Sequence, residues 1–234
     1  MAGLFVTFEG TEGSGKSTQI QLLADRLREL AREVITLREP GGTAIGEQIR
    51  TILKDREHGQ AMFSETELLL MNASRAQLVR EIIQPALASN KVVLCDRFFD
   101  STIAYQVYGR DLGLDQTQRI IDFAIAGTCP DLTLLLRIPL ELSEKRRAQR
   151  IASGGENEDR LEAENRAFFG RVEKGYDAIA SSTDTRVREI DGTQSVEQVH
   201  AEIWRWVEAL LCSPPTEGER AWKTIGEYRT ESPG

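Results

Sequence analysis

Residues 8–18 read FEGTEGSGKST and contain the pattern G-x-x-x-x-G-K-[ST], with Gly10, Gly15, Lys16 and Ser17 at its fixed positions. An apolar run precedes the pattern, and a segment with apolar residues at helical spacing follows it. Strand, glycine-rich turn and helix is the context in which this pattern binds a nucleoside triphosphate. Glycines let successive backbone N–H groups converge on phosphate oxygens, and the N-terminus of the following helix faces the same anion. The sequence therefore predicts a phosphate-binding loop.

The individual residues of this loop have distinct expected roles. Lys16 is expected to place a positive charge near the β- and γ-phosphates of ATP, and the Ser17 hydroxyl is expected to bind Mg²⁺. The co-substrate is thus expected to be ATP, with Mg²⁺ as the metal. The residues expected to contact ATP are Gly10, Thr11, Glu12, Gly13, Ser14, Gly15, Lys16, Ser17 and Thr18.

The composition limits the class of protein. The 234 residues carry a net charge of −8, so we expect no nucleic-acid partner, because such partners favour basic surfaces. The longest apolar runs are too short to cross a bilayer, and no export signal precedes the first predicted strand. Cys95, Cys129 and Cys212 form no C-x-x-C pair, and His58 and His200 lack metal-ligand spacing. We therefore expect a cytoplasmic protein without disulfides.

Short apolar runs alternate with segments of helical periodicity along the chain. This alternation predicts an α/β fold in which a five-stranded parallel sheet has helices on both faces. The ligand site is then expected at the carboxyl ends of the strands. The predicted strands are Leu4–Phe8, Val34–Leu37, Val92–Asp96, Leu132–Ile138 and Val187–Ile190. The helices predicted after the one that follows the phosphate loop are Ala44–Asp55, Phe63–Asn90 with a break or kink at Pro85, Gln116–Ala126, Leu140–Arg150, Leu161–Ala180 and Ser195–Leu211.

Residues 1–212 are predicted to form one domain, and the proline- and glycine-rich segment 213–234 is predicted to be a flexible tail. Lys145, Arg146, Arg147 and Arg150 precede the polar segment SGGENED. This arrangement is typical of a lid, here spanning about residues 146–160, whose closure excludes water and brings an arginine onto the transferring phosphoryl group. A solvated helix end, with cations complementing the helix dipole, explains the same residues equally well.

Charged residues stand at the ends of two predicted strands. Asp96 has the position of the carboxylate that supports Mg²⁺ in this fold, together with Ser17. Arg38 and Arg97 follow neighbouring strands and could clamp the phosphate of an acceptor opposite ATP, because a guanidinium binds phosphate through paired hydrogen bonds. For either arginine alone, a surface ion pair is the alternative interpretation.

With these motifs in view, the chain resembles the bacterial thymidylate kinases from about Leu4 to Leu211. The resemblance implies the fold of the nucleoside monophosphate kinases and the transfer of a phosphoryl group from ATP to dTMP. It also implies a homodimer, formed through helices such as the one containing Leu68–Ile83. The motifs that carry the resemblance are FEGTEGSGKST, REPGGT at 38–43, SRAQLV at 74–79, DRFFDSTIAYQ at 96–106, PDLTLLL at 130–136 and DRLE at 159–162.

The resemblance assigns roles in acceptor binding. Arg38 and Arg97 would hold the dTMP phosphate, and Arg75 would donate a hydrogen bond to thymine O4. Tyr105 would lie against the sugar where a 2′-hydroxyl would project. The implied substrate-binding residues are Glu12, Arg38, Pro40, Met71, Arg75, Arg97, Ser101, Thr102, Tyr105 and Gln106, with Thr102 and Gln106 at the remaining polar edge of the base.

Glu12 indicates which kind of family member the chain resembles. Members with an arginine in the phosphate loop supply the catalytic cation there, whereas members with an acidic residue supply it from the lid. Arg150 is the first candidate for that cation, followed by Arg146 and Arg147. The residues expected to take part in catalysis are Lys16, Arg97, Arg150 and Glu12.

Two residues depart from the family pattern. Met71 replaces a phenylalanine that commonly stacks on thymine, and Arg137 replaces an acidic residue at the end of the fourth strand. The softer thioether leaves open another nucleoside monophosphate kinase or a deoxynucleoside kinase. A nucleoside kinase needs a base for the 5′-hydroxyl, whereas the arginine pair favours a monophosphate acceptor. A nucleotide-dependent switch would need a guanine-reading motif such as N-K-x-D, which the sequence lacks.

Overall fold

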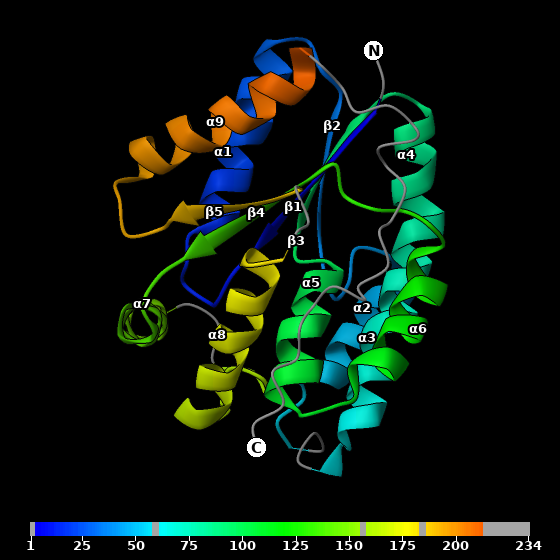
Figure 1. Ribbon diagram of the computed structural model, residues 1–234, viewed down its shortest axis with the longest axis vertical. Helices are drawn as coiled ribbons and strands as arrows, with labels where there is room; N and C mark the ends of the chain where they lie inside the picture. Colours follow the sequence, from blue (N-terminus) through cyan, green and yellow to red (C-terminus); the bar gives the residue numbers. More distant parts are fainter. Residues whose placement is uncertain (1–2, 58–60, 155–157, 183–185, 213–234) are drawn as a thin grey trace.

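The computed structural model describes residues 3–57, 61–154, 158–182 and 186–212. Its centre is a five-stranded parallel sheet with the order β2-β3-β1-β4-β5 (Figure 1). The predicted fold class and all the predicted strands are confirmed, with each strand boundary within one residue. The strands are β1 (Leu4–Glu9), β2 (Val34–Arg38), β3 (Val92–Asp96), β4 (Leu132–Arg137) and β5 (Val187–Asp191).

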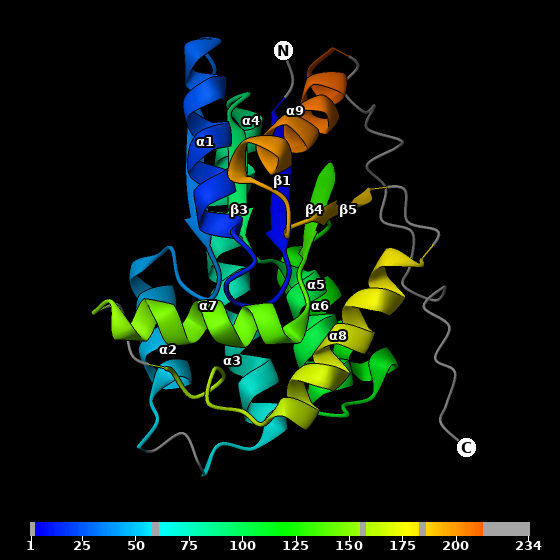
Figure 2. The same cartoon turned by 90° about the vertical axis from the view of Figure 1, so that its left-hand side faces the viewer.

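Helices cover both faces of the sheet. In Figure 1, α1 and α9 lie on one face, and α3, α5, α6 and α8 lie on the other. Figure 2 shows that α7 crosses the end of the sheet instead of covering a face. The helices are α1 (Lys16–Glu29), α2 (Ala44–Lys54), α3 (Ser64–Leu78), α4 (Gln84–Ala88), α5 (Phe99–Thr102), α6 (Leu114–Ile125), α7 (Leu140–Ala152), α8 (Arg166–Ala180) and α9 (Val196–Cys212), with π-helical segments η2 (Val79–Ile83) and η3 (Ile103–Gly109).

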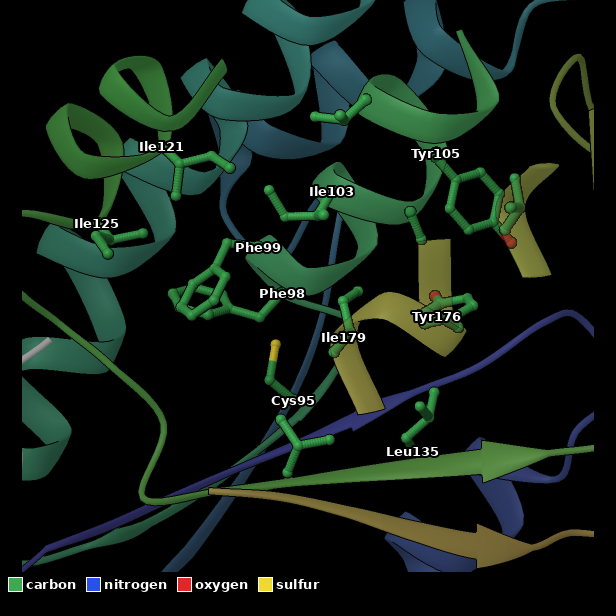
Figure 3. Close-up of a cluster of buried hydrophobic side chains, with 14 of the residues drawn as sticks. Cys95, Phe98, Phe99, Ile103, Tyr105, Ile121, Ile125, Leu135, Tyr176 and Ile179 are labelled. Carbon is green, nitrogen blue, oxygen red and sulfur yellow. The ribbon is translucent and has the colours of Figure 1, made fainter. Parts of the chain in front are cut away.

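Each face of the sheet has its own apolar core. Successive side chains of a strand point to opposite faces, so Val6 and Phe8 of β1 pack with α1 and α9, while Phe5 packs on the other side. The apolar core that contains Phe5 also contains Cys95 and Phe98. Figure 3 shows this cluster between the sheet and the helices above it. Both faces of the central strands are therefore buried, as the uninterrupted apolar runs predict.

Two of the helix predictions need correction. Of the break or kink predicted at Pro85 in the Phe63–Asn90 helix, the break is not found, because helical structure runs from Ser64 to Ala88. It continues through η2, whose wider turn accommodates a residue that lacks an N–H donor. The predicted Leu161–Ala180 helix begins only at Arg166, where the Asn165 side chain accepts the Phe168 N–H at 2.9 Å. Before it, the Asp159 carboxylate accepts backbone N–H groups and forms a turn.

Some sequence predictions concern residues that the structure does not describe, namely the tail 213–234, His58 and residues 155–157 of the predicted lid. Ser195 caps α9, since its Oγ accepts the Gln198 N–H at 3.3 Å. Within the described ranges, no helix combines the length and apolarity needed to cross a membrane.

Two glycines of α8 give a matched test of the packing between α8 and η3. A Cβ atom on Gly175 would lie 2.8 Å from the Ala104 Cα, whereas one on Gly170 would meet nothing within 4 Å. We expect Gly175→Ala to lower the free energy of unfolding by about 1–3 kcal/mol through overpacking. Gly170→Ala should raise it by about 0.4–1 kcal/mol, because alanine has less freedom in the unfolded chain. Urea unfolding of both variants measures the two effects; equal stabilities would contradict the packing described.

Candidate functional site

The phosphate loop has the backbone conformation that its glycines permit. Gly10, Gly13 and Gly15 have φ angles of 129°, 74° and 98°, a region that other residues rarely occupy. A Cβ atom on Gly15 would meet nothing within 4 Å, so open space adjoins the N-terminus of α1. The Lys16 Nζ donates to the carbonyl oxygens of Gly10 and Thr11 at 3.1 and 3.0 Å. The loop therefore wraps around the Lys16 ammonium group. This group lies next to the N-terminus of α1, which favours anions.

Helix α7 supports the outer side of this loop. Ser143 Oγ donates to the Glu12 carbonyl at 2.7 Å, and Arg146 Nη1 donates to the Gly13 carbonyl at 2.8 Å. A trans peptide unit is planar, with its C=O and N–H pointing in opposite directions. Fixing these two carbonyls on α7 therefore directs the N–H groups of Gly13 and Ser14 away from α7.

Ser17, in the first turn of α1, meets Asp96 at the carboxyl end of β3. The Ser17 hydroxyl donates to Asp96 Oδ2 at 3.1 Å. A hydroxyl and a carboxylate oxygen are the hard oxygen ligands that Mg²⁺ prefers. The donor set that the sequence predicts is thus brought together, and its chemistry fits the metal.

A carboxylate buried at the end of β1 shapes the neighbouring turn. Glu9 Oε1 accepts the backbone N–H groups of Phe98 and Ser101 at 2.7 and 3.3 Å. Its Oε2 accepts the hydroxyls of Ser101 and Tyr176 at 2.6 and 3.1 Å. These bonds hold the chain after β3, where Arg97 has a left-handed φ of 70° that is unfavourable for a residue with a side chain.

Arg97 projects from this turn into a cluster of oxygen atoms. Its Nη2 contacts Glu12 Oε1 at 2.6 Å and Tyr105 Oη at 3.2 Å, and its Nη1 contacts Ser101 and Tyr176. Burial alone would raise the pKa of Glu12, but the charges of Arg97 and Lys16 outweigh it and lower that pKa to about 2. Burial raises the pKa of Tyr105 to about 12, so its phenol is neutral.

A cavity of about 250 Å³ opens in front of these groups. It brings together every substrate-binding residue that the resemblance implies, along with both predicted metal ligands and Arg150. Segments far apart in the chain meet there, because parallel strands end at the same edge of the sheet. The predicted residues that line it are Glu12, Ser17, Arg38, Pro40, Met71, Arg75, Asp96, Arg97, Ser101, Thr102, Tyr105, Gln106 and Arg150.

Arg75 lies at the wall of the cavity with its guanidinium fully engaged. It donates to Glu39 and Asn72 at 2.9 Å, to Thr102 Oγ1 at 2.9 Å and to the Phe98 carbonyl at 3.1 Å. A direct hydrogen bond from Arg75 to a base would therefore replace one of these contacts. The donation to Thr102 leaves the hydroxyl proton of that threonine available to another acceptor.

The lid arginines differ in what they contact. Arg146 is bound to the phosphate loop, as described above. Arg147 is buried against the Phe169 ring and donates to the Glu162 carbonyl at 2.7 Å. Arg150 is partly exposed, lines the cavity and pairs with Glu162 Oε2 at 2.6 Å. Arg150 is thus the member of the three with its charge directed at the cavity.

Comparison with known proteins agrees with this geometry. The thymidylate kinase family model matches residues 8–203. A thymidylate kinase of Geotalea uraniireducens is 49% identical over 89% of this chain and 98% of its own length. One of Kosmotoga olearia is 44% identical over 89% and 96%. The crystal structure of thymidylate kinase from Ehrlichia chaffeensis superimposes with a TM-score of 0.71 and 32% identity, covering 88% of this chain and all of that one.

The chain belongs to the thymidylate kinase family. The predicted resemblance is thereby confirmed, and with it the class of phosphotransferase. The separate roles of the site residues stay predictions, since sequence similarity does not test them one by one.

The two departures from the family pattern have different outcomes. Met71 lines the cavity, and its expected role of covering the base stays a prediction. Arg137 lies outside the cavity lining and forms ion pairs with Asp177 of α8 and Glu189 of β5. Its charge therefore links elements at the edge of the sheet, which accounts for a residue that the sequence left unexplained.

The sequence missed several charged residues of the site. Glu39 and Arg50 line the cavity, and Arg50 donates to the Pro40 carbonyl at 2.9 Å. Glu162 holds Arg150, and Glu9 holds the Arg97 turn. A carboxylate directly after an apolar strand was the signal that identified Asp96, and the same signal applies to Glu9. Glu39 lies in the REPGGT motif and Glu162 in the DRLE motif, although neither carboxylate was given a role, and Arg50 carries no comparable mark in the sequence.

Glu9 predicts a pH dependence of stability. Burial and the charge of Asp100 raise its pKa from 4.5 to about 7, against the opposing effects of Arg97 and of hydrogen bonds from Ser101 and Phe98. The folded state therefore binds this proton more tightly, and the contribution of Glu9 to stability falls as the pH rises from 4.5 to about 7. We expect the stability of wild type relative to Glu9→Gln to be highest at the acid end of this range.

Urea unfolding of wild type and Glu9→Gln across this pH range measures the difference. The exposed Glu208→Gln is the control, and its difference from wild type should not vary with pH. A Glu9→Gln difference that is constant or that grows with rising pH would contradict the assignment.

Proposed function

We propose that the protein transfers the γ-phosphoryl group of ATP to the phosphate of dTMP, giving ADP and dTDP for the synthesis of dTTP. An oxygen of the dTMP phosphate forms the new bond to the γ-phosphorus, and the bond from that phosphorus to the ADP oxygen breaks. The observation that carries the proposal is the single cavity that joins the phosphate-loop residues Glu12 and Ser17 to the residues implied for dTMP. Catalysis in such a site is mainly positioning and charge stabilisation.

The donor half consists of the phosphate loop and the N-terminus of α1. Lys16 would exchange its contacts with the Gly10 and Thr11 carbonyls for oxygens of the ATP phosphates, a stronger charge-assisted interaction. Ser17 and Asp96 would hold Mg²⁺, which neutralises phosphate charge when it is bound. Burial next to Arg97 lowers the pKa of Lys16, a change that bound phosphates would reverse.

The acceptor half centres on Arg97. Its guanidinium is held by Glu12, Tyr105 and Tyr176 in a fixed orientation, which suits paired hydrogen bonds to a phosphate. Arg38 would contribute the second cation. It pairs with Glu47 at 2.9 Å and its side chain is 51% exposed, so this contact is weak enough to exchange.

Arg150 would supply the cation that stabilises the transferring phosphoryl group. It is joined to Glu162 at the rim of the cavity, and burial of Glu162 raises the pKa of that carboxyl. The cationic helix end would thus act as part of a lid over about residues 146–160. The proposed setting is the cytoplasm, in keeping with the cysteine pattern.

We also infer a homodimer. Helices α2, α3 and α6 pack side by side (Figure 1) and carry exposed apolar side chains. Ile45 and Ile52 of α2 are each 52% exposed, Leu69 of α3 is 56% exposed and Phe123 of α6 is 80% exposed. A second copy covering these helices would remove this apolar surface from water. Sedimentation velocity checks the inference, and a monomer at micromolar concentration would refute it.

An assay of ADP release with ATP, Mg²⁺ and a panel of dTMP, dUMP, dCMP, dGMP and AMP tests the proposed function. We expect dTMP to give the highest kcat/KM. Lys16→Ala should abolish turnover with the fold retained, because the loop loses its cation. A preference for another acceptor, or full activity of Lys16→Ala, would overturn the proposal.

Arg150→Ala tests the source of the catalytic cation. We expect kcat to fall by about 10²–10³, with a small change in KM for dTMP, because the contact is made in the transition state. Lys145→Ala, on the exposed side of the same helix, is the matched control and should retain its activity. If kcat is unchanged in Arg150→Ala, the cation comes from another residue.

A further inference from the structure

A second buried carboxylate, Glu67 of α3, lies directly behind the wall of the cavity. Its side chain is 1% exposed, one helical turn before Met71. Within the described part of the chain, every polar partner of this carboxylate is a donor. Oε1 accepts Gln106 Nε2 at 2.7 Å and Arg110 Nε at 3.2 Å, and Oε2 accepts Arg110 Nη2 at 2.9 Å and Arg160 Nη2 at 2.7 Å.

These partners keep Glu67 ionised. Burial alone would raise its pKa, but the hydrogen bonds and charges of Arg110, with help from Gln106 and Arg160, outweigh burial and lower it. An ionised carboxylate accepts hydrogen bonds and donates none. Only the NH₂ end of the Gln106 side chain can therefore face Glu67.

This orientation has a consequence on the other side of Gln106. The residue lines the cavity, and with Nε2 directed at Glu67 its Oε1 is the atom that remains for a ligand. Oε1 is an acceptor only. Gln106 therefore offers an acceptor to the base, although an amide that was free to turn would offer a donor equally well.

Thr102 provides the complementary group. Its Oγ1 already accepts a hydrogen bond from Arg75, so its hydroxyl is left as a donor at the same wall. Thymine presents an N3–H donor beside the O4 acceptor, which matches an acceptor next to a donor. Cytosine presents the reverse, an N3 acceptor beside an N4 amine donor. Its acceptor would face the Gln106 acceptor, and its donor would face the Thr102 donor.

We propose that Glu67 is a specificity-determining positioning residue that fixes the Gln106 amide so that the site accepts thymine and rejects cytosine. The inference rests on the proposed function, because it concerns the base of the same acceptor. Arg110 and Arg160 contribute by keeping Glu67 ionised. Arg160 is the last residue of the proposed lid, so the base pocket and the lid share one carboxylate.

Glu67→Gln is the direct test, with the ratio of kcat/KM for dTMP to kcat/KM for dCMP as the readout. A neutral amide at this position tolerates either end of Gln106, so we expect the ratio to fall by about tenfold or more. A purely structural role would lower both activities alike and leave the ratio unchanged, which would overturn the inference. Glu65→Gln, exposed on the same helix, is the matched control and should keep the wild-type ratio.

A double-mutant cycle shows whether Glu67 acts through Gln106. Gln106→Met removes the acceptor, and in that background Glu67→Gln should cause no further change in the ratio. An additional fall of similar size would mean that Glu67 acts by another route. If wild type fails to phosphorylate dTMP, the proposed function is overturned and this inference with it. An active wild type with an unchanged ratio in Glu67→Gln overturns this inference alone.

Nuclear magnetic resonance decides the question if Glu67→Gln does not fold. The side-chain amide signal of Gln106 in wild type is identified by its loss in Gln106→Met. An N–H bound to a buried carboxylate should be shifted downfield and protected from exchange with solvent. A signal at the ordinary position that exchanges rapidly would overturn the inference.

Discussion

The acceptor side of the cavity depends on the hydrogen bonds that Glu9 accepts from the turn after β3. That turn leaves the sheet with Arg97 in a left-handed conformation, whose cost is roughly 1–3 kcal/mol. The buried Phe98 N–H would also lose its hydrogen bond if the carboxylate were absent, whereas the Ser101 N–H would keep its contact with the Phe98 carbonyl at 3.2 Å. From the neighbouring strand β1, Glu9 stabilises this turn and provides an acceptor for its backbone N–H groups. The direction of the Arg97 side chain, which is proposed to hold the acceptor phosphate, is thus set by Glu9 of β1.

Opposite charges are paired throughout the site. Glu12 accompanies Arg97, Glu39 accompanies Arg75, and Glu162 accompanies Arg150. A cluster of unpaired guanidiniums would repel one another, and each carboxylate relieves that repulsion while holding one side chain in place. In the proposed mechanism, phosphate groups would compete with Glu12 for Arg97 and with Glu162 for Arg150. The partly exposed Arg150 pair is the easiest of the three to exchange, in keeping with the role proposed for Arg150.

The sequence predicts the sheet and the phosphate loop because their signals are local. A glycine pattern encodes a loop, and parallel strands bring their carboxyl ends together wherever they lie in the chain. Asp96 and Arg97 follow from that rule. The role of Glu67 does not follow from any local pattern. It depends on contacts with Arg110 and Arg160, which lie 43 and 93 residues away in the chain. The start of α8 was misplaced because Leu161 continues the apolar periodicity, whereas the Asn165 cap decides the boundary.

The contacts of α7 with the phosphate loop have a consequence for sequence variation. Ser143 and Arg146 are remote in the chain from the loop that they brace, Ser143 by 131 residues, and the carbonyls that they hold belong to the segment facing the nucleotide. A substitution at either position would alter the loop without touching any substrate. Natural variation at Ser143 and Arg146 is therefore constrained by nucleotide affinity. Substitutions at these positions of α7 should be accompanied by compensating substitutions in the phosphate loop.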